Sequence, residues 1–210
     1  HIYDTPDTYV GGSDLIEETL PILLEDGTIQ TKTFEYIPAL YNIFNEILVN
    51  ARDQIIRLQQ NKSKNPVTCL KITIDKGTGL ITIFNDGEGI DVAEHPTEKD
   101  KKGKPIMIPE MIFGHLLTST NYEKDEKKIV GGKNGYGAKL TNIFSQYFKL
   151  ETLDSSRGLK YSQTFEDNMK DRGKPKVSKN SGKSYTKISW IADFVRFGLD
   201  GYSKEMYQLM

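Results

Sequence analysis

The sequence contains little cysteine and no long apolar run, and each shortage excludes a class of protein. Cys69 is the only cysteine among the 210 residues, which excludes an internal disulfide framework and suits a reducing compartment. No apolar stretch approaches the roughly 20 residues that a membrane-spanning helix needs, and the first residues do not resemble a signal peptide. We therefore expect no membrane partner.

A net charge of one sign is also missing. Lysine and arginine number 28 and aspartate and glutamate 29, so no global positive field draws the chain to nucleic acid or to an anionic membrane. The three histidines have no metal-ligand spacing with Cys69 or with one another. The 37% hydrophobic content is typical of a globular protein. Because the chain begins at His1 without a methionine, we expect residues 1–210 to be one domain taken from a longer protein.

The most informative stretch is Pro38–Gln60, which we predict to be one helix. Apolar residues recur along one side at helical spacing; they are Leu40, Ile43, Phe44, Ile47, Ala51, Ile55 and Leu58. Glu46, Asn50 and Asp53 form a polar stripe about 120° away from that side. A carboxylate one turn from a carboxamide could activate a water and ligate a hard cation. An ordinary solvated helix face is the alternative that the helix alone leaves open.

Strand patterns surround this helix and predict an α/β fold. We expect strands at residues 20–24, 31–37, 69–75, 80–85, 150–153, 160–165 and 185–190, with a hairpin turn between the third and the fourth. Further helices are expected at residues 108–117, 140–148 and 202–210. The charged segment 91–105, with a lysine-rich tip at 99–104, predicts a solvated loop.

Two glycine-rich segments indicate a nucleotide site. The string NDGEG at 85–89 ends a predicted strand, where a fixed polar side chain could read the edge of a base, although the same string also forms ordinary turns. Four glycines within residues 131–137 precede a predicted helix, which favours a phosphate cradle with Lys133 and Lys139 as candidate point charges. The spacing fits neither a Walker A loop nor a dinucleotide fingerprint. A flexible lid without a ligand is the alternative.

In this order, the segments resemble the GHKL ATPase domain of eukaryotic-type type II DNA topoisomerases. The strings that carry the resemblance are PDTYVG at 6–11, IFNEILVNARD at 43–53, NDGEGI at 85–90, IPEMIFGHLLTSTNY at 108–122, GGKNGYGAKLTNIFS at 131–145 and SYTKISW at 184–190. The similarity covers essentially the whole chain. It implies a two-layer α/β sandwich, the GHKL or Bergerat fold, with a mixed sheet and helices on one face.

The resemblance also implies a role for individual residues, with ATP and Mg²⁺ as cofactors. Glu46 matches the general base and Asn50 the Mg²⁺ ligand, while Asn85 matches the residue that hydrogen-bonds adenine, supported by Thr186. Residues implied to line the adenine pocket are Ile90, Ile112 and Phe113. Those implied to contact ribose and phosphates are Ser119, Thr120 and Asn121. The implied phosphate-binding lid consists of Gly132, Lys133, Asn134, Gly135, Tyr136, Gly137, Ala138 and Lys139.

By the same resemblance, the chain is the ATP-hydrolysing N-gate domain of a type II topoisomerase, in which ATP-driven dimer closure is coupled to DNA strand passage. A homodimer and DNA binding are implied for the full-length enzyme. For this fragment we expect a monomer with weak turnover, since the family's N-terminal arm and transducer domain fall outside residues 1–210. The implied location is the nucleus, or a cytoplasmic factory for a viral protein. A chaperone-like GHKL ATPase and a nucleotide-sensing module with negligible turnover are the alternatives.

Three positions depart from the family pattern. Thr5 stands where the family has arginine, Arg52 where it usually has a small residue, and Lys133 where the lid usually has arginine. Lysine cannot replace arginine where a bidentate phosphate contact is needed.

Overall fold

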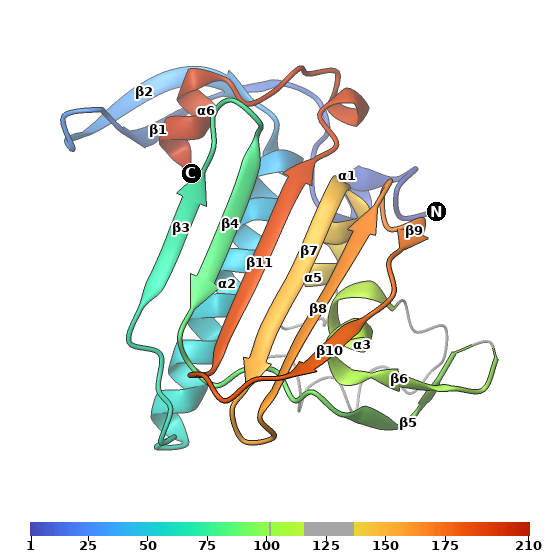
Figure 1. Ribbon diagram of the computed structural model, residues 1–210. Helices are drawn as coiled ribbons and strands as arrows, with labels where there is room; N and C mark the ends of the chain where they lie inside the picture. Colours follow the sequence, from blue (N-terminus) through green and yellow to red (C-terminus); the bar gives the residue numbers. More distant parts are fainter. Residues whose placement is uncertain (101, 116–136) are drawn as a thin grey trace.

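The computed structural model describes residues 1–100, 102–115 and 137–210 (Figure 1). Its helices are α1 (Pro6–Tyr9), α2 (Pro38–Gln60), α3 (Ile108–Gly114), α5 (Gly137–Ile143), the 3₁₀ turn η1 (Val195–Phe197) and α6 (Lys204–Leu209). The strands of the first half are β1 (Ile16–Leu23), β2 (Ile29–Tyr36), β3 (Leu70–Ile74), β4 (Leu80–Asn85), β5 (Glu94–Lys99) and β6 (Pro105–Met107). Those of the second half are β7 (Ser145–Asp154), β8 (Leu159–Glu166), β9 (Asp171–Arg172), β10 (Lys176–Lys179) and β11 (Tyr185–Ala192).

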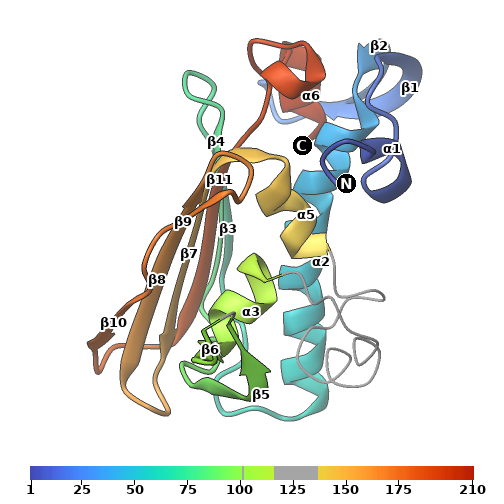
Figure 2. The same ribbon diagram turned by 90° about the vertical axis from the view of Figure 1, so that its right-hand side faces the viewer.

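The fold has two layers. The main sheet has the strand order β10-β8-β7-β11-β4-β3, with β9 beside β8. Helices α2, α3 and α5 lie on one face of this sheet, and none of the described helices lies over its other face (Figure 2). The predicted two-layer α/β arrangement is therefore confirmed. We expected a mixed sheet, whereas the strand pairs that the structure describes are all antiparallel.

Helix α2 has the bounds that its sequence predicts. Pro38 occupies the first turn, where its missing N–H costs no hydrogen bond. The helix ends at Gln60, before the polar segment 61–66. Its apolar side packs against the sheet, because Leu40, Ile43 and Phe44 are almost fully buried. The side of α2 that does not face the sheet carries the polar stripe of Glu46, Asn50 and Asp53.

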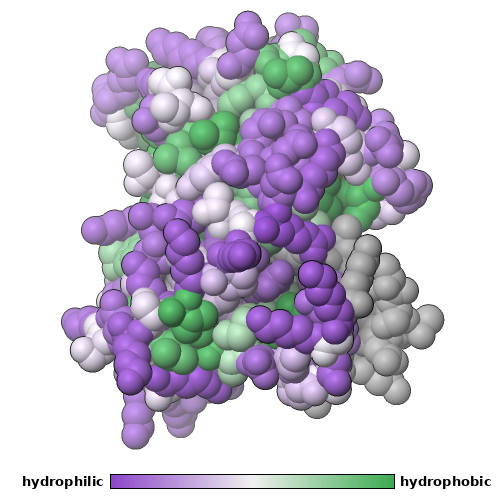
Figure 3. All heavy atoms as spheres, turned by 45° about the vertical axis from the view of Figure 1, so that its right-hand side comes forward, coloured by the Kyte–Doolittle hydropathy of each residue, from purple (hydrophilic) through white to green (hydrophobic). Residues whose placement is uncertain are grey.

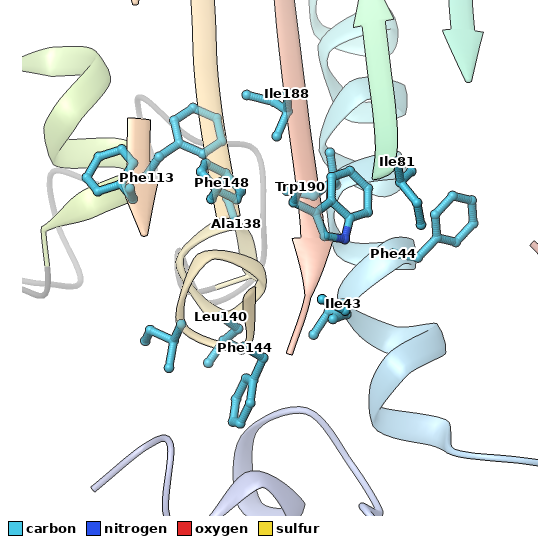
Figure 4. Packing of buried hydrophobic residues seen from close by; sticks show 14 of the residues in the cluster. Ile43, Phe44, Ile81, Phe113, Ala138, Leu140, Phe144, Phe148, Ile188 and Trp190 are labelled. Atoms are coloured by element: carbon cyan, nitrogen blue, oxygen red, sulfur yellow. The ribbon is translucent and has the colours of Figure 1, made fainter. Parts of the chain in front are cut away.

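The core lies between the sheet and these helices. Trp190 of β11, Phe148 of β7 and Phe44 of α2 are each no more than 2% exposed. Figure 4 shows Phe44 and Trp190 side by side, and their ring centroids lie 6.5 Å apart. Phe113 of α3 lies 6.0 Å from Phe148 in the same way. This packing fixes α2 and α3 over the central strands. It therefore also fixes the position of the polar stripe that α2 carries.

Two sequence-based predictions of secondary structure are wrong. The segment 91–105 is not a plain loop, since it contains β5 and the start of β6, which pair with each other. The helix expected at 140–148 is in fact the short helix α5 followed at once by β7. Smaller differences are that α1 forms within a segment without periodicity and that α3 ends at Gly114. Within the described residues, no helix is long and apolar enough to cross a membrane.

Candidate functional site

A cavity of about 290 Å³ lies between α2, α3 and the ends of β4 and β11. Its volume is at the lower end of the range for small-molecule sites. Seven of the predicted site residues line it: Asn50, Asn85, Ile90, Ile112, Phe113, Ala138 and Thr186. Apolar walls are completed by Ile47, Ile83, Ile108 and Ile188. The cavity therefore combines a largely apolar enclosure with a few polar groups, as a site for a heterocyclic ring requires.

Two of these polar groups are adjacent because of strand pairing. Asn85, the last residue of β4, is directly opposite Thr186 of β11. Asn85 is only 6% exposed, and its side-chain oxygen accepts a bond from the N–H of Gly87 at 3.4 Å. Thr152 lies beside Thr186, with 3.3 Å between the two hydroxyl oxygens. A carboxamide and hydroxyls thus meet at the buried end of the cavity, where they can recognise the polar edge of a base.

The turn that follows Asn85 is fixed on both sides. The Asp86 carboxylate accepts bonds from the N–H groups of Thr68 and Cys69 at 2.8 and 2.7 Å. Burial acts to raise the pKa of Asp86, but these and its other hydrogen bonds outweigh it and lower the pKa below its usual value. Gly89 passes so close to β7 that an added Cβ would lie 2.0 Å from the Leu153 carbonyl oxygen. Only glycine fits there, which explains the second glycine of NDGEG.

Glu46 and Asn50 lie one turn apart on the polar stripe of α2. Asn50 lines the cavity, and Glu46 lies beside the first residue of α5. Partial burial raises the pKa of the Glu46 carboxyl above its usual value. A carboxylate with a raised pKa is a better proton acceptor, which suits a general base.

Helix α5 is held against α2 by a buried hydrogen bond. The Thr141 hydroxyl, which is fully buried, donates to the backbone carbonyl of Ile43 at 2.8 Å. The neighbouring Asn142 donates to the carbonyl of Phe113 at 2.9 Å and so links α5 to α3. These two bonds set the position of Gly137 and Ala138 relative to Glu46. The geometry around Glu46 therefore depends on how α2, α3 and α5 pack together.

The remaining predicted site residues divide into two groups. Lys139 lies on α5 with a fully buried side chain and is not among the cavity-lining residues. Residues of the second group lie outside the described residues: Ser119, Thr120, Asn121, Gly132, Lys133, Asn134, Gly135 and Tyr136. Their roles stay predictions.

Several polar residues of the cavity were not among the predicted site residues. Gln54 and Arg57 continue the stripe of Glu46, Asn50 and Asp53 along α2, and both line the cavity. The Gln54 side chain donates to the Glu88 carbonyl at 3.1 Å and accepts from Arg57 at 2.8 Å. The stripe therefore also braces the NDGEG turn. Extending the helical spacing of the stripe by one turn, from Asn50 to Gln54 and from Asp53 to Arg57, would have identified both residues.

The side chains of the site suit a nucleotide whose bound cation takes one ligand from the protein. Within the described part of the chain, no cluster of three or more His, Cys, Asp or Glu side chains is arranged to hold a metal ion. Mg²⁺ in phosphoryl-transfer sites is commonly held by one or two protein ligands together with phosphate oxygens and waters. Asn50, which lines the cavity one turn from Glu46, is suited to that role.

Comparison with known proteins agrees with this geometry. Residues 35–178 match the family described as Histidine kinase-, DNA gyrase B-, and HSP90-like ATPase. DNA topoisomerase 2 of Acanthamoeba polyphaga mimivirus is 45% identical over 206 residues, which are 95% of this chain and 15% of that protein. DNA topoisomerase 2-alpha of Mus musculus is 42% identical over 211 residues, covering 100% of this chain and 13% of the relative. The chain thus spans only a small part of the length of these curated relatives.

A solved structure shows the same relation. The ATPase region of Saccharomyces cerevisiae topoisomerase II superposes with a TM-score of 0.82 at 42% identity, and the match covers 99% of this chain and 52% of that one. The family model covers the segment that contains Glu46, Asn50 and Asn85. The chain belongs to the family of histidine kinase-, DNA gyrase B- and HSP90-like (GHKL) ATPases, and over its whole length it is similar to the ATPase region of topoisomerase II.

Proposed function

We propose that this chain binds ATP together with Mg²⁺ and hydrolyses it as the N-gate domain of a type II DNA topoisomerase. The observation that carries the proposal is one arrangement: the Asn85–Thr186 pair closes an apolar cavity whose α2 wall presents Asn50, with Glu46 one turn away. The strand ends would then recognise the base, while α2 would supply both the cation ligand and the residue that activates the water. The similarity to the ATPase region of yeast topoisomerase II supports the same assignment.

Each residue has a defined task in this reaction. Asn85 and Thr186 would bind the polar edge of adenine, while Ile90, Ile112 and Phe113 enclose its faces. Glu46 would accept a proton from the water that attacks the γ-phosphate, and its raised pKa favours that transfer. Asn50 would hold Mg²⁺, which neutralises the charge on the phosphate oxygens when it is bound.

The partners of the whole protein belong to this proposal as well. The similar proteins are named DNA topoisomerase 2, so we propose DNA strand passage by a homodimer, with closure of two such domains driven by ATP. We further propose a nuclear location for a cellular protein and a cytoplasmic factory for a viral one. The isolated domain is proposed to be monomeric.

Calorimetric titration with a non-hydrolysable ATP analogue, with and without Mg²⁺, tests the nucleotide site. Stoichiometric binding that requires Mg²⁺ is the expected result, because the adenine and cation contacts proposed above all come from residues of this chain. Absence of binding at millimolar analogue would overturn the proposal for this chain. Tight binding without measurable turnover, even in a longer form of the protein, would favour a nucleotide-sensing module.

A further inference from the structure

The uncovered face of the main sheet carries a dense set of lysine and hydroxyl side chains. Phe148, Leu150 and Trp190 point into the core, so the residues that alternate with them point to the other side. We call these residues the open sheet face; they are Lys71, Thr73, Thr82, Phe84, Tyr147, Lys149, Glu151, Lys160, Ser162, Thr164, Glu166, Lys176, Lys187 and Ser189. Among the residues that the structure describes, no helix lies over this face (Figure 2).

The lysines of the open sheet face outnumber its carboxylates. Lys149 and Lys160 both pair with Glu151, at 3.9 and 3.3 Å, so that this carboxylate is already offset. Lys71, Lys176 and Lys187 are exposed, and no carboxylate within the described ranges lies within ion-pair distance of them. The face therefore keeps an excess of positive charge.

This excess is local and is hidden by the overall balance of the chain. Residues 1–60 contain ten acidic and three basic residues, whereas residues 170–187 contain seven basic residues and one aspartate. The net charge of −1 thus combines an acidic N-terminal part with a basic segment that contributes Lys176 and Lys187 to the open sheet face. Such an asymmetry is typical of a surface that meets a polyanion.

Protection of sheet edges does not explain the pattern. Lysines on edge strands prevent strand-to-strand aggregation, and this accounts for Lys71 on β3 and Lys176 on β10. Lys187, Lys149 and Lys160 lie on the interior strands β11, β7 and β8. The ion pairs with Glu151 account for Lys149 and Lys160, so Lys187 is the interior lysine that needs another reason.

The dimensions of the face fit a nucleic-acid duplex. Lys71, Lys187 and Lys176 lie in one row of directly paired residues that crosses five strand-to-strand steps, or about 24 Å at about 4.8 Å per step. Duplex DNA carries one charge per about 1.7 Å of axis, so a row of this length faces several phosphates. In the neighbouring row the hydroxyls of Thr82 and Ser189 lie 2.9 Å apart and bond to each other, and Ser189 is buried. The exposed Thr73 of that row carries a hydroxyl of the kind that donates to phosphate.

Two aromatic residues of this region, Phe84 and Tyr185, are already engaged with each other, which argues against binding of a single strand. Phe84 stacks on Tyr185, with centroids 5.7 Å apart and an interplanar angle of 30°. The Tyr185 hydroxyl is also engaged, since it donates to Glu151 at 2.6 Å. Single-strand binding requires aromatic faces that are free to stack on bases. Lysines and hydroxyls, by contrast, contact only the backbone and read no sequence.

We propose that the open sheet face binds the phosphate backbone of duplex DNA without sequence specificity. The proposal is independent of the nucleotide site, because none of the open-face residues lines the cavity. Figure 3 shows the mainly hydrophilic character of the side of the molecule that includes part of this face.

Fluorescence anisotropy with a labelled 20-base-pair duplex tests the proposal in a salt series. We expect a dissociation constant of roughly 10⁻⁴ to 10⁻⁶ M near physiological salt, typical of non-specific binding. The variant K71E/K176E/K187E should bind at least about tenfold more weakly, and its slope of log K against log salt should be smaller by about 2.7, or 0.9 for each lysine.

A matched control distinguishes the effect of the open sheet face from the effect of the total charge of the chain. K99E/K102E/K104E makes the same charge change at three exposed lysines of the β5–β6 hairpin, and should weaken binding by less than about threefold. Both variants should keep the unfolding temperature and the affinity for an ATP analogue. Equal loss in both variants, no binding by the unmodified chain, or tighter binding of a single strand of the same length would each overturn the proposal.

Discussion

Gly137 lies directly against the carboxylate of Glu46. A Cβ added to Gly137 would be 1.7 Å from Oε2 of Glu46 and 2.7 Å from its Cδ. These distances leave no room for a side chain, so any other residue at the start of α5 must displace the carboxylate. The two residues are 91 positions apart in the sequence, and the hydrogen bond from Thr141 to Ile43 brings them together.

Gly137→Ala should therefore impair turnover although it is favourable for the helix. Alanine in place of glycine within a helix stabilises the helix by up to about 1 kcal/mol. A loss of turnover therefore cannot come from a lower helix propensity. We expect kcat at saturating ATP to fall at least about tenfold, because a misplacement of about 1 Å at a catalytic group has effects of that size or larger. Gly201→Ala is the control, since nothing lies within 4 Å of its added Cβ. An unchanged kcat in Gly137→Ala would show that Glu46 is free to move.

Glu46→Gln should abolish turnover and also stabilise the fold at neutral pH. Burial raises the pKa of Glu46 from 4.5, so the folded chain binds the proton more tightly than the unfolded chain does. Stability then falls as the pH rises from about 4.5 to the raised value and stays lower above it. The neutral glutamine removes this cost, so the variant should melt at a higher temperature at pH 7.

Thermal unfolding at pH 4 to 8, with calorimetric titration of an ATP analogue, checks this expectation. Glu25→Gln, which makes the same change at an exposed turn position, should leave the unfolding curve unchanged. Analogue binding should persist in Glu46→Gln. If binding is lost, Glu46 has a structural role and is not the base.

The sequence predicts most accurately where one periodicity continues for a long distance. Helix α2 and strand β4 have the predicted bounds, because their apolar residues recur regularly and polar turns limit them. The error at 140–148 has a physical cause. Leu140, Phe144 and Phe148 have helical spacing, but α5 ends at Ile143, just before Phe144, and Phe148 belongs to β7. All three are buried, so a buried helix end followed by a buried strand imitates one amphipathic helix.

Contacts across the fold were less predictable than the elements themselves. The Asn85–Thr186 pair depends on the register of β4 with β11, which no local pattern specifies. The segment of β5 contains a proline and four charged or histidine residues among six, so it has no strand periodicity to detect. Its pairing with β6 comes from tertiary context. Long-range proximity of this kind also brings Gly137 to Glu46.

Asn85→Ala should weaken nucleotide binding specifically. The side chain is 6% exposed and ends at the polar side of the cavity. Loss of a hydrogen bond worth about 0.5–1.5 kcal/mol corresponds to a roughly two- to tenfold lower affinity for an ATP analogue. Thr82→Ala changes the same strand on its other face and should leave the affinity unchanged. Equal affinity of Asn85→Ala and the unmodified chain would show that adenine binds elsewhere.

Asp154→Asn should destabilise the chain and reduce its sensitivity to acid. Asp154 is 4% exposed, and it accepts bonds from the Val92 N–H at 3.0 Å and from Arg157 at 2.8 Å. Burial acts to raise its pKa, but these bonds and those from Ser156 outweigh burial and hold the pKa below 3.8. The stability that the carboxylate contributes is therefore present above about pH 3.8 and is lost as the pH falls through the lower folded value.

Asparagine keeps the shape of Asp154 but not its charge, so we expect a loss of about 1.5–3 kcal/mol at pH 7, typical of hydrogen bonds to a charged group. Denaturant unfolding at pH 7 and at pH 3 measures both effects. The difference between the variant and the unmodified chain should shrink at pH 3, because that pH lies below 3.8 and the unfolded chain, whose carboxyl pKa is not lowered, then binds the proton more readily than the folded chain does. Asp200→Asn removes an exposed carboxylate and should change stability by less than about 0.5 kcal/mol at either pH. A difference at pH 7 that persists unchanged in acid would mean that Asp154 stabilises the turn by its shape, not by its charge.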